Sequence, residues 1–208
     1  DNKSIEMHNR AGTFPMDLPE KFGELGTLGP TVPEEYGGLG TSSVAYGLMM
    51  QELERGDSGL RSFCSVQGSL CMYPIYTYGS EEQKQRILPK MVTGEIVGAI
   101  AMTEPGAGSD LQSIRSTADK DGDDYIINGA KTFITNGQHA NLILVAAKTN
   151  PDEKAKGMSL VILETDGADG FTRGRKLEKI GMKSADTSEL FFDNISIPPE
   201  NILGGEEG

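Results

Sequence analysis

The sequence predicts an α+β protein, in which an N-terminal α-helical domain over residues 1–95 precedes an antiparallel β-barrel or β-sheet domain over residues 96–208. Three observations support this fold class. Apolar residues recur at helical spacing before residue 95, the later apolar runs are short and β-branched, and no segment of crossover-helix length separates those runs. A length of 208 residues is enough for one large domain or two modest ones.

The helical part is expected to contain three helices. The first covers residues 41–55, with hydroxyl caps at its start and with Val44, Leu48 and Met49 on one apolar stripe. The second covers residues 58–72 and ends where Pro74 breaks the pattern. The third follows a capping box that the segment SEEQ at 80–83 forms, because a serine with a glutamine three residues later is the signature of that cap.

Short β-branched runs predict the strands of the second domain. Asp121-Gly122 and Asn128-Gly129 are the expected turn dipeptides. The expected strands cover residues 96–103, 123–129, 131–136, 141–149, 158–165 and 188–197.

Charge and composition exclude several classes of protein. Lys and Arg number 19 and Asp and Glu number 31, so the net charge is −12, which repels nucleic acid and anionic membranes. Hydrophobic residues make up 37% of the chain, and no apolar run approaches the roughly 18 residues of a membrane span. We therefore expect a soluble globular protein without a nucleic-acid partner.

Cysteine and histidine predict neither a disulfide nor a metal site. Cys64 and Cys71 lie about 10 Å apart along one predicted helix, beyond the roughly 7 Å that a disulfide can span, so both are expected to be buried thiols. His8 and His139 fit no metal-ligand spacing, and surface or capping roles are expected for them.

The loop AMTEPGAGSD at residues 101–110 carries the clearest chemical signal. Gly106 and Gly108 allow the backbone to approach a ligand closely, and Ser109 adds a hydroxyl donor. The segment is neither a Rossmann fingerprint nor a P-loop. Taken alone, it fits an anion-binding loop or an ordinary glycine-rich turn.

Together with a second motif, this loop closely resembles the acyl-CoA dehydrogenase flavoenzyme family. The two strings are MTEPGAGSD at 102–110 and YIINGAKTFITNG at 125–137. Three further segments extend the resemblance over nearly the whole chain: PEEYGG at 33–38, YGSEEQK at 78–84 and SADTSELFFDNISIPPENILG at 184–204.

The resemblance implies an FAD site with two walls. In the first wall, Thr103 would hydrogen-bond the flavin ring and Ser109 would reach the pyrophosphate and the edge of the acyl-CoA site. In the second, the Phe133 ring would pack on the flavin and the Thr135 hydroxyl would point at N5. Many members carry Trp where this chain has Phe133, which keeps the π surface but lacks the indole N–H. The implied cofactor-binding residues are Ile100, Met102, Thr103, Gly108, Ser109, Phe133, Ile134 and Thr135.

A substrate site is also implied. Residues 46–83 are more similar to the glutaryl-CoA dehydrogenase branch, where Arg61 would bind the distal carboxylate of the substrate, with Ser62 assisting and Ser109 beside the acyl-CoA. A guanidinium can bind a carboxylate bidentately. The alternative is a solvated arginine paired with Asp57. Residues 99–208 resemble the straight-chain members better, so glutaryl and straight-chain substrates both stay open.

A basic run precedes the last expected strand. It could contact CoA phosphates, or it could be a solvated face. Its members are Arg173, Arg175, Lys176 and Lys179.

The implied reaction is α,β-dehydrogenation of an acyl-CoA thioester, in fatty-acid or amino-acid catabolism. A carboxylate base takes the α proton, the β hydrogen leaves as hydride to the flavin, and electrons pass to an electron-transfer flavoprotein. Family members continue into a C-terminal helical domain that bears the base. We therefore expect this chain to be a fragment of a homo-oligomeric bacterial cytoplasmic or mitochondrial matrix enzyme, with no catalytic residue of its own to name. The alternative is a flavin-binding or acyl-CoA-binding module without turnover.

Overall fold

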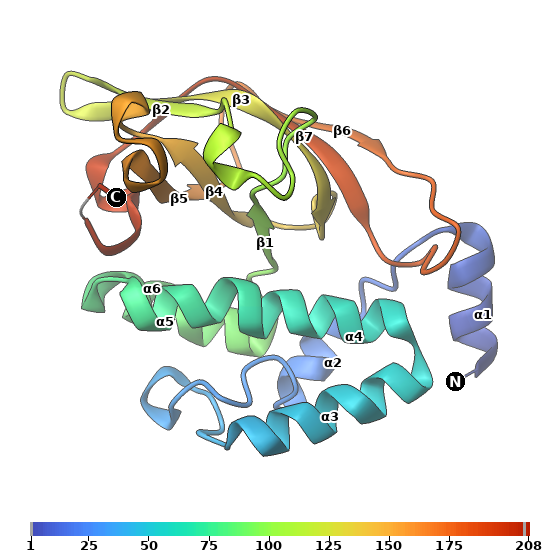
Figure 1. Ribbon diagram of the computed structural model, residues 1–208. Helices are drawn as coiled ribbons and strands as arrows, with labels where there is room; N and C mark the ends of the chain where they lie inside the picture. The colour runs from blue at the N-terminus through green and yellow to red at the C-terminus, as the bar shows by residue number, and fades with distance from the viewer. Residues whose placement is uncertain (1, 206) are drawn as a thin grey trace.

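The computed structural model describes residues 2–205 and 207–208, which form a layer of helices beneath a seven-stranded sheet (Figure 1). This arrangement confirms the predicted α+β class. Strand β1 (Gly98–Ala101) rises from the helical layer into the sheet. The helices are α1 (Asn2–Ala11), α2 (Leu18–Glu24), α3 (Ser43–Gly56), α4 (Ser58–Ser65), α5 (Tyr73–Tyr78) and α6 (Glu81–Thr93).

Helix α3 begins close to where the sequence predicts, because the Ser42 side chain accepts a hydrogen bond from the Ala45 N–H. Met49 of its expected apolar stripe packs against the core, but Val44 and Leu48 do not. Val44 is 72% exposed and Leu48 is 59% exposed, whereas Met50 is buried. The helix packs through a neighbouring edge of its surface.

The second predicted helix continues through Pro74 rather than ending before it. Residues Val66–Met72 form a π-helix between α4 and α5, and Pro74 lies in the first turn of α5, where its missing N–H is tolerated best. Gln67 in the π-helix donates to the Met91 and Ile96 carbonyl oxygens and accepts from the Gly98 N–H. The π-helix is therefore tied directly to β1.

The predictions for the thiols and for the third helix are confirmed. Cys64 and Cys71 are free and buried, and burial raises the pKa of Cys64 to about 12. Ser80 and Gln83 form the capping box of α6. The Gln83 amide also donates to the Glu200 and Ile202 carbonyl oxygens, which ties the C-terminal segment to the helical layer.

The sheet is mixed, not wholly antiparallel. Strand β4 pairs in parallel with β1 and β2, because the chain passes through the β2–β3 hairpin before it returns beside β1. The strand order is β1-β4-β2-β3-β7-β6, with β5 antiparallel to β4. The remaining strands are β2 (Thr117–Asp121), β3 (Asp124–Thr135), β4 (Leu142–Lys148), β5 (Met158–Glu164), β6 (Phe171–Lys176) and β7 (Thr187–Ile197).

Strand β3 fuses two expected strands into one. Asp121-Gly122 makes the β2–β3 turn as predicted, but Asn128-Gly129 is not a turn. It lies inside β3 at a register shift, where Gly129 has a φ of 153° and packs against Ser116. A second register shift lies between Lys131 and Ile134. Such bulges redirect side chains, and this one lies within the second motif.

Strand β4 is buried on both faces and connects the two cores of the molecule. Leu142 and Leu144 pack with the helical layer, while Ile143 and Val145 pack on the opposite side of the sheet. Alternate side chains of a strand point to opposite faces, which explains the continuous apolar run.

No helix among residues 2–205 and 207–208 is long and apolar enough to cross a membrane. The same described residues contain no group of three or more His, Cys, Asp or Glu side chains that could hold a metal ion.

Candidate functional site

The two sequence motifs meet around one cavity of about 150 Å³. The loop after β1 and the end of β3 form two of its sides, and the π-helix forms a third. Six of the predicted cofactor-binding residues line it: Ile100, Met102, Thr103, Phe133, Ile134 and Thr135. Val66 and Leu70 of the π-helix complete the lining, and the motif analysis did not identify them.

Phe133 is the most unusual residue of this cavity. Its φ is 59°, a conformation that bulky side chains avoid, and its ring is 67% exposed. Such strain costs on the order of 1–3 kcal/mol and persists only where the neighbouring structure imposes it. Here the neighbours are the buried Thr132, whose N–H donates to the Thr103 carbonyl oxygen at 2.9 Å, and the buried Ile134. The bulge therefore presents an aromatic face to any planar ligand.

The hydroxyl groups of Thr103 and Thr135 are available to such a ligand. Both residues are half-buried at the cavity. Within the part of the chain that the structure describes, neither side chain has a hydrogen-bond partner. A ligand edge with donors or acceptors could satisfy them.

A buried ion pair lies directly behind the cavity. The Lys131 side chain is 0% exposed and that of Glu104 is 6% exposed, with 2.9 Å between Lys131 Nζ and Glu104 Oε1. Burial lowers the pKa of Lys131, although the Glu104 carboxylate opposes this effect. Burial alone would raise the pKa of Glu104, but the Lys131 ammonium and the Arg115 and Ser116 N–H groups outweigh it and lower that pKa. Both charged residues lie inside the two sequence motifs, but neither was among the predicted site residues.

The glycine-rich part of the first motif lies outside the cavity lining. Gly108 and Ser109 are exposed, and a Cβ added at Gly108 would meet nothing within 4 Å. A tight turn, in which Glu104 and Ala107 exchange backbone hydrogen bonds of 2.9 and 3.2 Å, separates them from Thr103. The chain's own packing does not require a glycine at position 108.

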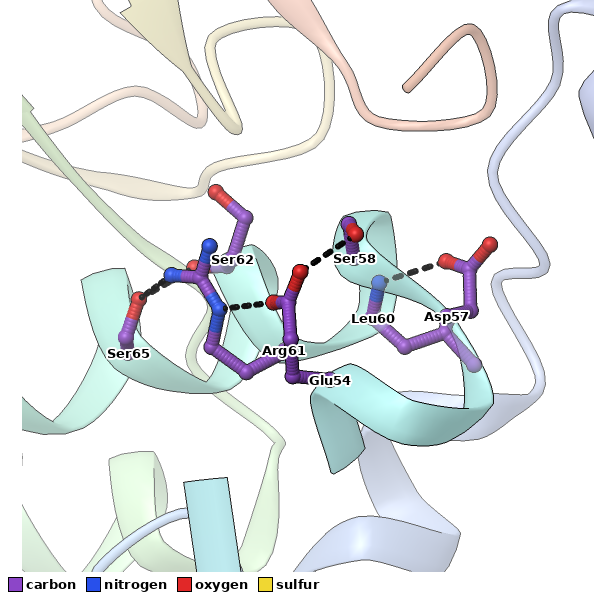
Figure 2. A network of polar contacts seen from close by, with 7 residues as sticks. All are labelled: Glu54, Asp57, Ser58, Leu60, Arg61, Ser62 and Ser65. Atoms are coloured by element: carbon purple, nitrogen blue, oxygen red, sulfur yellow. Dashed lines mark hydrogen bonds and ion pairs between the residues drawn. The ribbon is translucent and has the colours of Figure 1, made fainter. Parts of the chain in front are cut away.

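Arg61 belongs to a polar network at the start of α4 (Figure 2). Its Nε donates to Glu54 Oε2 at 2.6 Å and its Nη1 donates to Ser65 Oγ at 3.2 Å. Asp57, the partner that the alternative interpretation assigned to Arg61, instead caps α4 by accepting from the Leu60 N–H at 2.8 Å. The predicted partner Asp57 is therefore wrong, and Arg61 is instead a half-buried cation that pairs with Glu54.

Among the described residues, Ser62 makes no hydrogen bond to Arg61. It is half-buried, and its carbonyl oxygen accepts from Ser65 Oγ at 3.0 Å. Ser65 is the hydroxyl that contacts the guanidinium, a helical neighbour of Arg61 four residues along the chain that sequence reasoning missed.

Most basic side chains of the run after residue 172 bind backbone carbonyl oxygens and do not form a free cationic patch. Arg173 donates to the Gly137 and Ala140 carbonyl oxygens, and Lys179 donates to the Ala185 carbonyl oxygen. Lys176 donates to the Gly12 carbonyl oxygen. Of this run, Arg175 is largely exposed and pairs with Glu189. The solvated-face interpretation is thus wrong for Arg173, Lys176 and Lys179.

Comparison with known proteins assigns the family. Residues 2–95 match "Acyl-CoA dehydrogenase, N-terminal domain", and residues 99–195 match "Acyl-CoA dehydrogenase, middle domain". The chain belongs to the acyl-CoA dehydrogenase family. The resemblance found in the sequence motifs is thereby confirmed.

Relatives with different substrate names are similar to this chain. The "Long-chain specific acyl-CoA dehydrogenase, mitochondrial" of Sus scrofa is 44% identical over 199 residues, which cover 95% of this chain and 46% of that protein. The structure of a glutaryl-CoA dehydrogenase from Mycobacterium smegmatis in complex with FADH2 has a TM-score of 0.92 and 42% identity, covering 100% of this chain and 52% of that one. For an acyl-CoA dehydrogenase from Geobacillus kaustophilus the TM-score is 0.88 at 50% identity, over 97% of this chain and 53% of that one.

The chain thus spans about half the length of the relatives that it matches. Those relatives include both long-chain and glutaryl-CoA enzymes. Family membership therefore leaves the acyl group undecided.

Proposed function

We propose that this chain forms the FAD-binding and acyl-binding part of an enzyme that dehydrogenates acyl-CoA thioesters at the α and β carbons. The main support is the cavity that both motifs line. There the Thr103 and Thr135 hydroxyls, which have no partner among the described residues, lie beside the strained, exposed Phe133. The similarity to a solved glutaryl-CoA dehydrogenase that holds FADH2 adds support.

The lining residues fit a flavin. A planar, largely apolar ring system with polar edges needs an aromatic face and a few hydroxyl donors, and the cavity offers both. Ligand pockets usually have a volume of about 300–1,000 Å³, whereas this cavity has about 150 Å³. We infer that this chain encloses one edge of the FAD and that further protein surface covers the rest.

The side chains of the cavity would orient the reactants. FAD, when bound, supplies the acceptor for the β hydrogen. Thr103 and Thr135 would donate hydrogen bonds to the ring, Ile100, Met102 and Ile134 would exclude water, and Gly108 and Ser109 would lie along the cofactor and the CoA. The carboxylate base and the electron-transfer flavoprotein that receives the electrons would be supplied from outside this chain.

Because of Arg61, a dicarboxylic acyl group such as glutaryl is the favoured substrate class. Ser62 would assist in binding its distal carboxylate. The guanidinium is half-buried and, within the described part of the chain, forms an ion pair with one carboxylate, that of Glu54. A substrate carboxylate could share or replace that contact. A straight-chain acyl group is the competing candidate, supported by the similarity to the long-chain enzyme.

We further propose that residues 1–95 and 96–208 are two domains of a longer, homo-oligomeric enzyme of the bacterial cytoplasm or mitochondrial matrix. The second candidate function is a flavin-binding or acyl-CoA-binding module without turnover. The cavity lining among the described residues supplies hydroxyl and apolar groups but no carboxylate, which favours this candidate.

Visible absorption of the purified protein tests the proposal. We expect a flavin band that shifts when glutaryl-CoA or butyryl-CoA is added. A protein that stays colourless after incubation with FAD would contradict flavin binding by this chain. A band that responds to neither thioester would contradict the acyl site.

A further inference from the structure

The Lys131–Glu104 ion pair joins the two motifs at the back of the cavity. Lys131 Nζ donates to the Met102 carbonyl oxygen at 3.0 Å and to Glu104 Oε1 at 2.9 Å. Met102 lines the cavity from one side, and Lys131 stands two residues before Phe133, which lines it from the other. The ammonium therefore connects the two walls directly.

Glu104 extends this connection to a third segment. It accepts the Arg115 N–H at 2.6 Å through Oε2 and the Ser116 N–H at 3.0 Å through Oε1. The adjacent backbone bond, from the Thr132 N–H to the Thr103 carbonyl oxygen, runs alongside at 2.9 Å. The chain on both sides of the glycine-rich loop is thus fastened to β3 at one point.

Stability does not explain why charges occupy this position. Replacing a buried ion pair by well-packed apolar residues of similar volume is often neutral or stabilising, since desolvation offsets the attraction of the charges. Apolar side chains, however, could not bond to the Met102 carbonyl oxygen. What the charges add is a directional link between the walls.

We propose that Lys131 and Glu104 are positioning residues that set the distance between the Thr103 wall and the Phe133–Thr135 wall, and thereby the affinity and environment of the flavin. This inference rests on the proposed FAD site. Neither residue lines the cavity, so both act through Met102, Thr103 and Phe133.

The test compares two variants of the full-length natural protein with the wild type. The double variant Lys131→Met/Glu104→Leu removes both charges and leaves neither unpaired. Gln83→Met is the matched control, because Gln83 is also a buried residue that bonds to two carbonyl oxygens, but it contacts the C-terminal segment instead of the cavity. The readouts are the FAD dissociation constant from flavin fluorescence, the position of the visible flavin band, and the melting temperature.

We expect the double variant to melt several degrees below the wild type, because the Met102 carbonyl oxygen and the Arg115 and Ser116 N–H groups lose their partners. Its FAD dissociation constant should rise about tenfold, the effect of losing one hydrogen bond to the ligand, and its flavin band should shift. The control should keep the FAD affinity and the band of the wild type. A double variant that also keeps both would overturn the inference.

Lys131→Arg decides the question if the double variant does not fold. It keeps the charge and changes the geometry, so a positioning role predicts weaker FAD binding, whereas unchanged affinity and band position contradict that role. A wild-type protein that binds no FAD would refute the proposed function, and this inference with it. A wild type that binds FAD beside an unaffected variant would refute this inference alone.

Discussion

Two cation–carboxylate pairs differ in their surroundings, and we expect them to have different roles. Lys131 and Glu104 are 0% and 6% exposed, while Arg61 and Glu54 are 32% and 46% exposed. The first pair is enclosed by three segments of backbone and cannot exchange its partners without unfolding. The second can release its carboxylate to a ligand or to water. The buried Lys131–Glu104 pair can therefore shape the site, whereas the half-exposed Arg61–Glu54 pair can take part in ligand binding.

The largest effect is expected when one charged partner of the buried Lys131–Glu104 pair is removed. Lys131→Met leaves Glu104 charged and unpaired, which should lower the free energy of unfolding by about 3–5 kcal/mol. Urea denaturation at neutral pH measures this. Lys90→Met is the control, because the Lys90–Glu95 pair is 52% and 64% exposed with 3.6 Å between its charged atoms. Equal losses from both variants would show that burial does not distinguish the pairs.

The second-largest effect is expected from acid, which should weaken the Lys131–Glu104 pair. The pKa of Glu104 is lowered in the folded chain, so its contribution is present above the unfolded-state pKa of about 4.3 and is lost as the pH falls through the folded-state value. The stability difference between the wild type and Glu104→Gln should therefore be large at pH 7 and shrink below about pH 4. Urea titrations at several pH values measure it. A difference independent of pH would mean that the Glu104 charge does not stabilise the fold.

Arg61→Met should affect binding far more than folding. The melting temperature should change by less than about 3 °C, because half-exposed ion pairs add little stability. The affinity for glutaryl-CoA should fall about tenfold, the effect of losing one charge-assisted hydrogen bond, while butyryl-CoA should bind as before. Arg55→Met is the control, since Arg55 pairs with Glu52 on the neighbouring turn. Equal losses for both thioesters would argue for a general role in the acyl pocket.

The smallest effect is expected from freeing Arg61. Glu54→Gln removes the competing carboxylate and should raise the affinity for glutaryl-CoA a few-fold, by roughly 2- to 5-fold, without a change for butyryl-CoA. Glu52→Gln serves as the matched control. The measurement is the ligand-induced shift of the flavin band as a function of thioester concentration. Weaker glutaryl-CoA binding would show that Glu54 orients Arg61 for the substrate.

Local signals in the sequence predicted much of the fold. The Ser80–Gln83 box and the Asp121-Gly122 turn depend on a few neighbouring residues, and both form as expected. Strands β2 and β6 were missed because their polar and basic sequences, TADKD and FTRGRK, carry little apolar alternation. Strand β6 stands at the end of the strand order, where charged side chains protect an edge.

The sequence predicted the parts of the candidate site that the two motifs form. Thr103 and Thr135 meet at one cavity, as the family resemblance implies. The bulge that turns Phe133 outward and the π-helix that supplies Leu70 depend on tertiary packing, which no short pattern encodes. Arg61 was identified, but its partner Glu54 lies on another helix, and spacing along one helix pointed to Asp57 instead.

The amide of Gln67 determines which part of the site can open. It holds the π-helix to β1 and to the end of α6 through three hydrogen bonds, so these elements should open together, in a single rare event. In the turn at residues 105–110, Ala107 is buried and bonded to Glu104, but Gly106, Gly108 and Ser109 are exposed. Amide exchange should therefore be slow at Gly98 and fast at Gly108, and ligands would enter past the glycine-rich turn while the helical side stays closed.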